Sequence, residues 1–201
     1  EVVEPKTIVV FSDYIWPFCY IGEEALYRLS EELTLEIDWK GLEIHPEFPP
    51  EGVLAETYLN RDRMALLWRN VKGLALESGL EMKMPARLSK SELSLLGGQF
   101  SKERGRLREY SLAIYQAYFF KGQNIASPQV LSESIEEAGM DPEEFTCALS
   151  EDRLRKTLKV YQKEAQEQFV TAVPTFFIGG KRLVGAQSYQ LLKETVLSSN
   201  P

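Results

Sequence analysis

Cysteine is scarce in this sequence: two residues, Cys19 and Cys147, stand far apart in a chain of 201. Secreted domains that depend on disulfides carry closely spaced sets of cysteines, so we expect no secreted disulfide framework and a cytoplasmic protein. Residues 1–12 show no charged segment followed by an apolar one, although a signal peptide could have been removed before residue 1.

Long apolar runs and an excess of positive charge are also absent. No stretch approaches the roughly 20 apolar residues of a membrane helix. The 23 Lys and Arg residues are outnumbered by 30 Asp and Glu, and the formal charge of −7 argues against nonspecific binding to nucleic acid or anionic lipid. We therefore expect a protein or small-molecule partner, with no nucleic acid, no membrane and no metal site.

The first third of the sequence predicts a strand, a helix and a second strand. Residues 7–11 form a short β-branched and aromatic run, residues 19–33 carry apolar side chains at helical spacing, and residues 35–44 alternate between apolar and polar. Because a helical connection joins parallel strands, both carboxyl ends lie at one edge of the sheet. The loop 12–18 and His45 are therefore expected at the same edge.

Helical patterns then dominate from about residue 56 to residue 169, which is too long for a simple crossover. We predict that residues 56–169 form an inserted helical subdomain, while residues 1–55 and 170–201 form one α/β domain. The second part of that domain contains a strand-like run over 172–178, a Gly-Gly-Lys turn, a return strand over 182–184 and a last helix.

Glycines predict an interruption in the long helical segment 89–120. Glycine costs about 1 kcal/mol in a helix interior. We therefore expect a break or bend either near Gly97 and Gly98 or near Gly105.

Two further groups of residues are predicted to be structural. Trp39, Trp68 and Phe119 stand at strand or helical spacing and are expected in the core. Glu23 and Glu24 lie on the charged face of the helix that begins near residue 19. Neither group is expected to form a site.

Cys19 is the strongest candidate nucleophile. It follows Trp16, Pro17 and Phe18 at the start of a helix, where free backbone N–H groups and the helix dipole lower a cysteine pKa below its usual ~8.5. The alternative is an inert buried thiol, because free cysteine is among the most buried residue types.

A proline opens the last buried strand, where it removes a backbone donor. A cis bond between Val173 and Pro174 would turn the carbonyl and N–H of Val173 outward, where they can pair with an extended substrate backbone. The alternative is an ordinary trans proline on an edge strand.

Six short motifs follow one another along the chain: Trp-Pro-Phe-Cys-Tyr-Ile-Gly at 16–22, Leu-Glu-Ile-His-Pro at 42–46, Pro-Pro-Glu-Gly at 49–52, Lys-Glu-Arg-Gly at 102–105, Val-Pro-Thr-Phe at 173–176 and Gly-Ala-Gln at 185–187. Together with the order of the predicted elements, they resemble the DsbA-like thioredoxin superfamily. Within it, the chain is most similar to the FrnE-type oxidoreductases and their relatives, 2-hydroxychromene-2-carboxylate isomerase and kappa-class glutathione transferase. The resemblance covers nearly the whole chain and implies a thioredoxin-like α/β fold, βαβ plus ββα, with a large all-helical insertion.

The resemblance also implies a redox site, which this sequence carries only in part. FrnE-type proteins have Cys-Pro-Trp-Cys in the first loop, where the first cysteine attacks a substrate disulfide and the second resolves the mixed disulfide. Here Trp16 stands at the first position, and Cys147 is not expected to replace the missing sulfur because its segment predicts a buried helix face. We therefore predict a degenerate oxidoreductase with catalytic-loop residues Trp16, Pro17, Phe18 and Cys19. Its chemistry is monothiol exchange with glutathione or protein thiols and disulfides.

One alternative is a glutathione-dependent isomerase or transferase. Those relatives place a serine where Trp16 stands, but residues that resemble their glutathione-binding parts persist: Val173 beside Pro174, and the N–H groups of Gln187 and Ser188 at a helix start. Glutathione would then be a co-substrate, and the partner would be a glutathione-linked small molecule. No other cofactor is expected to be bound.

The other alternative is a non-catalytic module that holds an extended peptide or a small ligand against Val173 and Trp16. An indole offers one N–H donor and a large face for stacking. His45, the only histidine, is expected at the same sheet edge and is a candidate ligand contact. Monomer and homodimer both remain open.

Overall fold

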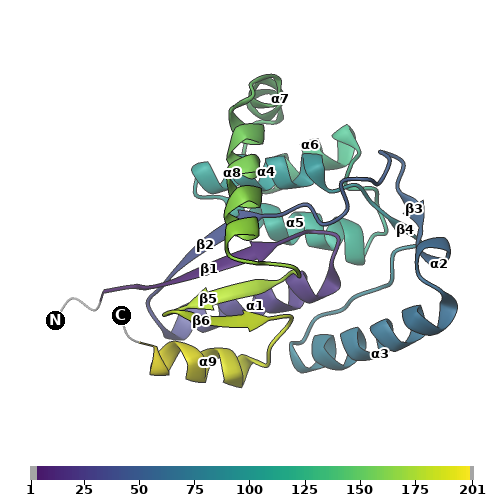
Figure 1. The fold of residues 1–201 in the computed structure, drawn as a ribbon. Coiled ribbons are helices and arrows are strands. Elements are labelled where there is room, and N and C mark those ends of the chain that lie inside the picture. The colour runs from purple at the N-terminus through teal and green to yellow at the C-terminus, as the bar shows by residue number, and fades with distance from the viewer. Residues whose placement is uncertain (1–3, 200–201) are drawn as a thin grey trace.

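The computed structural model describes residues 4–199. Figure 1 shows a four-stranded sheet with helices on both sides and a helical region inserted between its second and third strands. The elements are β1 (Lys6–Ser12), α1 (Pro17–Glu32), β2 (Leu35–Gly41), β3 (Val53–Leu54), α2 (Ala55–Tyr58), α3 (Arg61–Glu77), β4 (Arg87–Leu88), α4 (Glu92–Glu103), α5 (Leu107–Phe119), α6 (Pro128–Glu137), α7 (Pro142–Ser150), α8 (Arg153–Glu167), β5 (Thr175–Ile178), β6 (Lys181–Val184) and α9 (Tyr189–Ser198).

The sheet has the order β2-β1-β5-β6. β1 and β2 are parallel, as the strand–helix–strand pattern predicts, while β5 pairs antiparallel with β1 and with β6. α1 packs closely on the sheet at Gly22, where an added Cβ atom would lie 2.8 Å from the ring of Phe176 in β5. The sequence therefore predicts the α/β order correctly, and the chain has a thioredoxin-like fold with a helical insertion.

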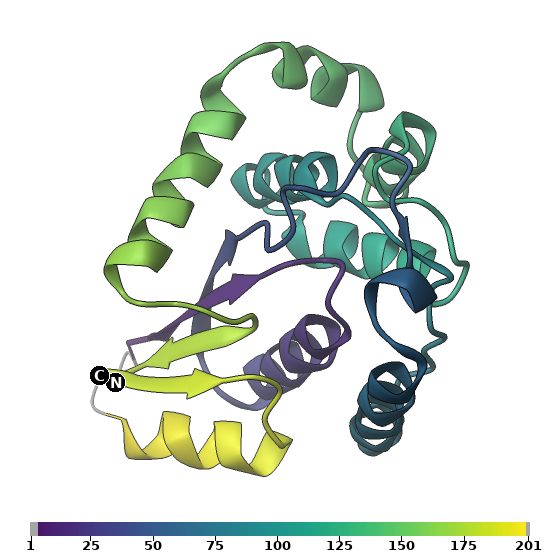
Figure 2. The ribbon, with the colours of Figure 1, turned by 45° about the vertical axis from the view of Figure 1, so that its right-hand side comes forward.

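The insertion packs mainly through α4, α5 and α6, while α7 and α8 arch back toward β5 (Figure 2). α3 lies apart from that bundle, beside α1. A short antiparallel ribbon of β3 and β4 interrupts the helices, a detail that the sequence pattern did not predict.

The long helical segment breaks at Gly105, between α4 and α5, where the glycine has a φ of 67°. Gly97 and Gly98 lie inside an unbroken α4, so the first of the two predicted break points is wrong. A Cβ atom at Gly98 would lie 2.6 Å from the ring of Trp39 and 2.7 Å from the hydroxyl of Tyr14. These glycines are therefore needed for close packing of α4.

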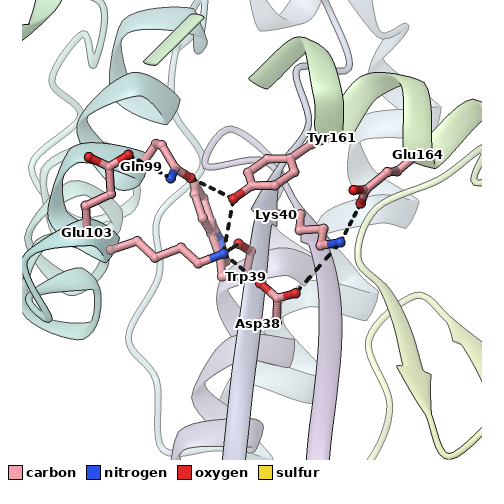
Figure 3. A network of polar contacts seen from close by, with 8 residues as sticks. Asp38, Trp39, Lys40, Gln99, Glu103, Tyr161 and Glu164 are labelled. Atoms are coloured by element: carbon pink, nitrogen blue, oxygen red, sulfur yellow. Dashed lines mark hydrogen bonds and ion pairs between the residues drawn. The ribbon is translucent and has the colours of Figure 1, made fainter. Parts of the chain in front are cut away.

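A polar network holds α8 and α4 against the outer strand β2 (Figure 3). The Nζ of Lys102 donates to Asp38 Oδ1 at 2.6 Å and lies 3.2 Å from the hydroxyl of Tyr161, and Lys40 pairs with Glu164. Because an outer strand exposes unpaired backbone groups, this cover also protects β2 from pairing with another chain.

The division into units at residues 55 and 169 stays a prediction. Residues 1–3 and 200–201, which were assigned to the α/β unit, lie outside the described residues. Between residues 4 and 199, no helix combines the length and the apolar character that a membrane span requires.

Candidate functional site

The loop before α1 orients its side chains in two directions. Trp16 is the N-cap residue and Pro17 begins the helix, a position that suits proline because the first helical N–H groups have no partner. Trp16 and Phe18 are partly exposed, and their rings meet edge to face at 5.7 Å. Cys19 has no exposed surface. Trp16 and Phe18 thus reach the surface, while the thiol of Cys19 does not.

Cys19 lies in an interior that disfavours a thiolate. Burial raises the pKa of the Cys19 thiol well above its ordinary value, although the backbone N–H of Asp13 donates to its Sγ at 3.5 Å and acts in the opposite direction. The predicted lowering of this pKa is therefore wrong, because desolvation outweighs the favourable position at the helix start.

Two buried carboxyl groups, those of Asp13 and Glu23, lie near this thiol, and no pattern in the sequence predicts their burial. Glu23 accepts hydrogen bonds from the hydroxyls of Ser12, at 2.5 Å, and Tyr115, while its Oε1 has no partner among residues 4–199. Burial raises the pKa of Glu23 to about 7 and that of Asp13 to about 6. Glu23 was expected on a charged helix face, which is wrong at this residue because Tyr115 of α5 packs on it, while Arg28, Glu31 and Glu32 of the same face are exposed.

The Val173–Pro174 turn lies against the same helix. The peptide bond between these residues is cis, one of the two alternatives that the sequence left open. A Cβ atom on Gly22, one turn beyond Cys19, would lie 3.4 Å from Pro174 Cγ. Two segments more than 150 residues apart in sequence therefore meet at the start of α1.

An apolar pocket of about 260 Å³ opens beside Trp16. Its walls come from the loop before α1, from the segment after β2, and from the α2, α3, β4 and α5 regions. The lining residues are Ile15, Trp16, Pro17, His45, Ala55, Tyr58, Leu59, Met64, Leu67, Trp68, Met84, Pro85, Leu88 and Phe119. The structure thus brings together three of the predicted site residues, Trp16, Pro17 and His45, whereas Phe18 and Cys19 do not line this pocket.

His45 reaches the pocket because the end of β2 is fixed beside the first loop. The backbone N–H of Ile44 donates to Asp13 Oδ2 at 2.9 Å. His45 Nδ1 lies 2.8 Å from Glu47 Oε1, and the ring stacks on Phe48 at 4.5 Å. The hydroxyl of Tyr58 lies 3.2 Å from Nδ1 and 3.4 Å from Nε2. The expected common edge of the first loop and His45 is therefore confirmed.

Gln187 and Ser188 line a different pocket, of about 340 Å³, together with Arg28 and the end of α3. Ser188 caps α9 by accepting from the backbone N–H of Leu191 at 3.2 Å, and the Gln187 side-chain amide donates to the carbonyl of Val184 at 2.8 Å. The structure therefore does not bring these two residues into the pocket beside Trp16.

Several residues of the pocket wall were not predicted from the sequence to belong to a site. Trp68 and Phe119 were expected in the core; both are buried, but each also contributes to the pocket wall. Tyr58 lies in α2, a four-residue helix without a periodic pattern. Cys147 is exposed on α7, so the prediction of a buried helix face there is wrong at this residue.

Solved structures with this architecture have different functions. A probable DsbA oxidoreductase from Streptomyces coelicolor superposes with a TM-score of 0.84 at 20% identity, over 98% of this chain and 92% of the other. A 2-hydroxychromene-2-carboxylate isomerase has a TM-score of 0.79 at 19% identity, over 94% and 93%. The cytosolic disulfide reductase DsbM from Pseudomonas aeruginosa has a TM-score of 0.67 at 17% identity, over 94% and 93%. At these identities the likeness shows the fold alone.

Sequence comparison gives the family. The uncharacterized protein YwbO from Bacillus subtilis is 30% identical over 196 residues, which cover 94% of each chain. The sequence profile of the DsbA-like thioredoxin domain matches residues 7–196. The chain therefore belongs to the DsbA-like thioredoxin domain family.

Proposed function

We propose that this chain binds an apolar small molecule beside Trp16 and does not carry out a dithiol–disulfide cycle. The observation that carries the proposal is a contrast at the start of α1. Trp16 forms part of the wall of an apolar pocket, while Cys19, three residues later in the helix, has no exposed surface.

Thiol chemistry at Cys19 is disfavoured on two grounds. Exchange requires a thiolate that can reach the substrate sulfur, and burial both covers Cys19 and raises its thiol pKa. A dithiol cycle also requires a second nearby sulfur, and Trp16 stands where the FrnE-type proteins that this chain resembles have their first cysteine. Monothiol exchange at Cys19, the first prediction from the sequence, is therefore not the function we favour.

The pocket wall suits an apolar ligand with a flat face. Trp16, Trp68 and Phe119 supply aromatic surface, and Met64 and Met84 supply flexible side chains that adapt to a ligand shape. Removing apolar surface from water contributes roughly 25 cal/mol per Å², so even a small hydrocarbon gains affinity here. Trp16 then acts as a binding surface in place of a redox group.

Equilibrium dialysis of 2-methylnaphthalene against the protein tests this proposal. We expect saturable binding that weakens about tenfold, or about 1.4 kcal/mol, in Trp16→Ala, because the variant loses one wall of the pocket. Phe169→Ala is the matched control, since Phe169 is a 78% exposed aromatic residue that does not line the pocket. Absence of binding to the unmodified protein, or equal binding by Trp16→Ala, would contradict the proposal.

A second candidate function is glutathione-dependent isomerisation or transfer. It is favoured by the separate pocket at Gln187 and Ser188, where Arg28 supplies a cation beside the start of α9. DsbM, a cytosolic disulfide reductase of this fold, has a solved structure with glutathione. If this chain binds glutathione there, tenfold excess over Kd should add about 1.4 kcal/mol to the free energy of unfolding. No rise in Tm at millimolar glutathione, or an equal rise in Arg28→Ala, would count against it.

The cytoplasmic location expected from the low cysteine content stays a prediction, as does the choice between monomer and homodimer.

A further inference from the structure

We infer that His45 and Tyr58 form a hydrogen-bond-accepting end of the pocket, so that it selects apolar ligands carrying a hydroxyl or N–H group. This inference rests on the proposed function and names the class of ligand. Among the lining residues, His45 and Tyr58 have the only side chains with a nitrogen or oxygen acceptor. The indoles of Trp16 and Trp68 can only donate.

Glu47 determines which nitrogen of His45 carries the proton. A backbone N–H and the His45 ring donate to this carboxyl group and hold its pKa below the usual value, so it is ionised at neutral pH. An ionised carboxylate can only accept, and its Oε1 lies 2.8 Å from Nδ1. Nδ1 of the neutral ring therefore carries the hydrogen, which leaves Nε2 as an acceptor.

Tyr58 completes the arrangement. Its hydroxyl lies 3.2 Å from Nδ1 and 3.4 Å from Nε2, and an oxygen at nearly equal distance from both ring nitrogens lies over the face of the imidazole. The lone pair of Nε2 lies in the plane of the ring, so the hydroxyl leaves it free for a ligand. The phenol oxygen is a second acceptor at this end of the pocket.

The ring of His45 is also held in place, which makes the acceptor a fixed feature of the pocket. Phe48 stacks on the imidazole at 4.5 Å with an interplanar angle of 11°, and Phe48 is itself buried. Tyr58 meets both rings edge to face at 5.1 Å. A ligand can therefore form the hydrogen bond without a further loss of conformational entropy in the imidazole side chain.

The test compares two uncharged probes of nearly equal shape, 2-naphthol and 2-methylnaphthalene, by equilibrium dialysis at pH 8. The unmodified protein should bind 2-naphthol about fivefold more tightly, the effect of one added hydrogen bond between neutral groups. In the double variant His45→Phe with Tyr58→Phe, which keeps the aromatic stack, the two probes should bind equally. The affinity for 2-methylnaphthalene measures any change in the apolar wall, so the ratio of the two affinities reports the hydrogen bond alone.

The outcomes separate the two proposals. Equal binding of both probes by the unmodified protein, or an undiminished preference for 2-naphthol in the double variant, would overturn the acceptor site and leave the apolar pocket standing. If neither probe binds the unmodified protein, the proposed function itself fails. Far-UV circular dichroism and Tm of the double variant show whether it keeps the fold. If it does not, the single variant Tyr58→Phe should still reduce the preference for 2-naphthol, because Tyr58 is a partly exposed residue of a short helix.

Discussion

Replacing Glu23 with glutamine should remove most of the pH dependence of folding stability near neutral pH. Glu23 is buried between α1 and α5, where hydroxyls of Ser12 and Tyr115 donate to one of its two oxygens. Burial raises its pKa from 4.5 to about 7, so the folded protein holds a proton that the unfolded chain has already released. Stability therefore falls as the pH rises from about 4.5 to about 7 and then levels off.

The magnitude follows from the size of this shift. At about 1.4 kcal/mol per pKa unit, ionising Glu23 in the folded state lowers the free energy of unfolding by about 3 kcal/mol in total. About 1 kcal/mol of that loss occurs between pH 6 and pH 8. Asp13, with its pKa raised to about 6, adds less than about 0.5 kcal/mol in this window, because most of its loss occurs at lower pH.

Urea unfolding followed by tryptophan fluorescence at pH 6, 7 and 8 measures these differences. The unmodified protein should lose between about 1 and 2 kcal/mol from pH 6 to pH 8, and Glu23→Gln should lose less than about 0.5 kcal/mol. Glutamine mimics the protonated acid in size and charge, so the comparison isolates the ionisation. An equal loss in both proteins, or stability that rises with pH, would refute the assignment of Glu23 as a buried acid with a raised pKa.

Two further predictions concern packing and exposure. Iodoacetamide should alkylate exposed Cys147 at least about tenfold faster than buried Cys19 in the native protein, and equal rates by peptide mass spectrometry would contradict the burial of Cys19. Gly98→Ala should destabilise the fold by about 1–3 kcal/mol, because its methyl group would meet the ring of Trp39. The matched change Gly73→Ala in α3 meets nothing within 4 Å and should stabilise by up to about 1 kcal/mol, and equal Tm values for the two variants would refute this packing account.

The sequence predicts the α/β framework well because local patterns determine it. β1 and β2 show β-branched and alternating runs, and the glycines at 179 and 180 mark the hairpin between β5 and β6. Gly105 ends α4 for a local reason, since its φ of 67° is costly for other residues. Gly97 and Gly98 resemble Gly105 in sequence, but they do not break the helix. They leave room for side chains that are distant in the chain, such as Trp39.

The site is less predictable because its properties depend on long-range packing. A helix start favours a thiolate, yet the burial of Cys19 beside Asp13 and Glu23 raises its thiol pKa, and no local pattern predicts that burial. Glu23 follows the charged pattern of an exposed helix face until Tyr115 packs on it. No local pattern predicts that α3 contributes to the pocket wall. Trp68 has the helical spacing of a core residue, and a tryptophan that lines a pocket has the same spacing.

The most direct test of the central claim is the reduction of insulin disulfides by the unmodified protein and by Trp16→Cys, with dithiothreitol as the electron source. We expect no activity above background for the unmodified protein, and clear activity for the variant, which has the second sulfur of a dithiol at the start of α1. Activity in the unmodified protein equal to that of the variant would show that Cys19 reaches substrate unaided, and would contradict the proposal that Trp16 provides a binding surface in place of a redox group.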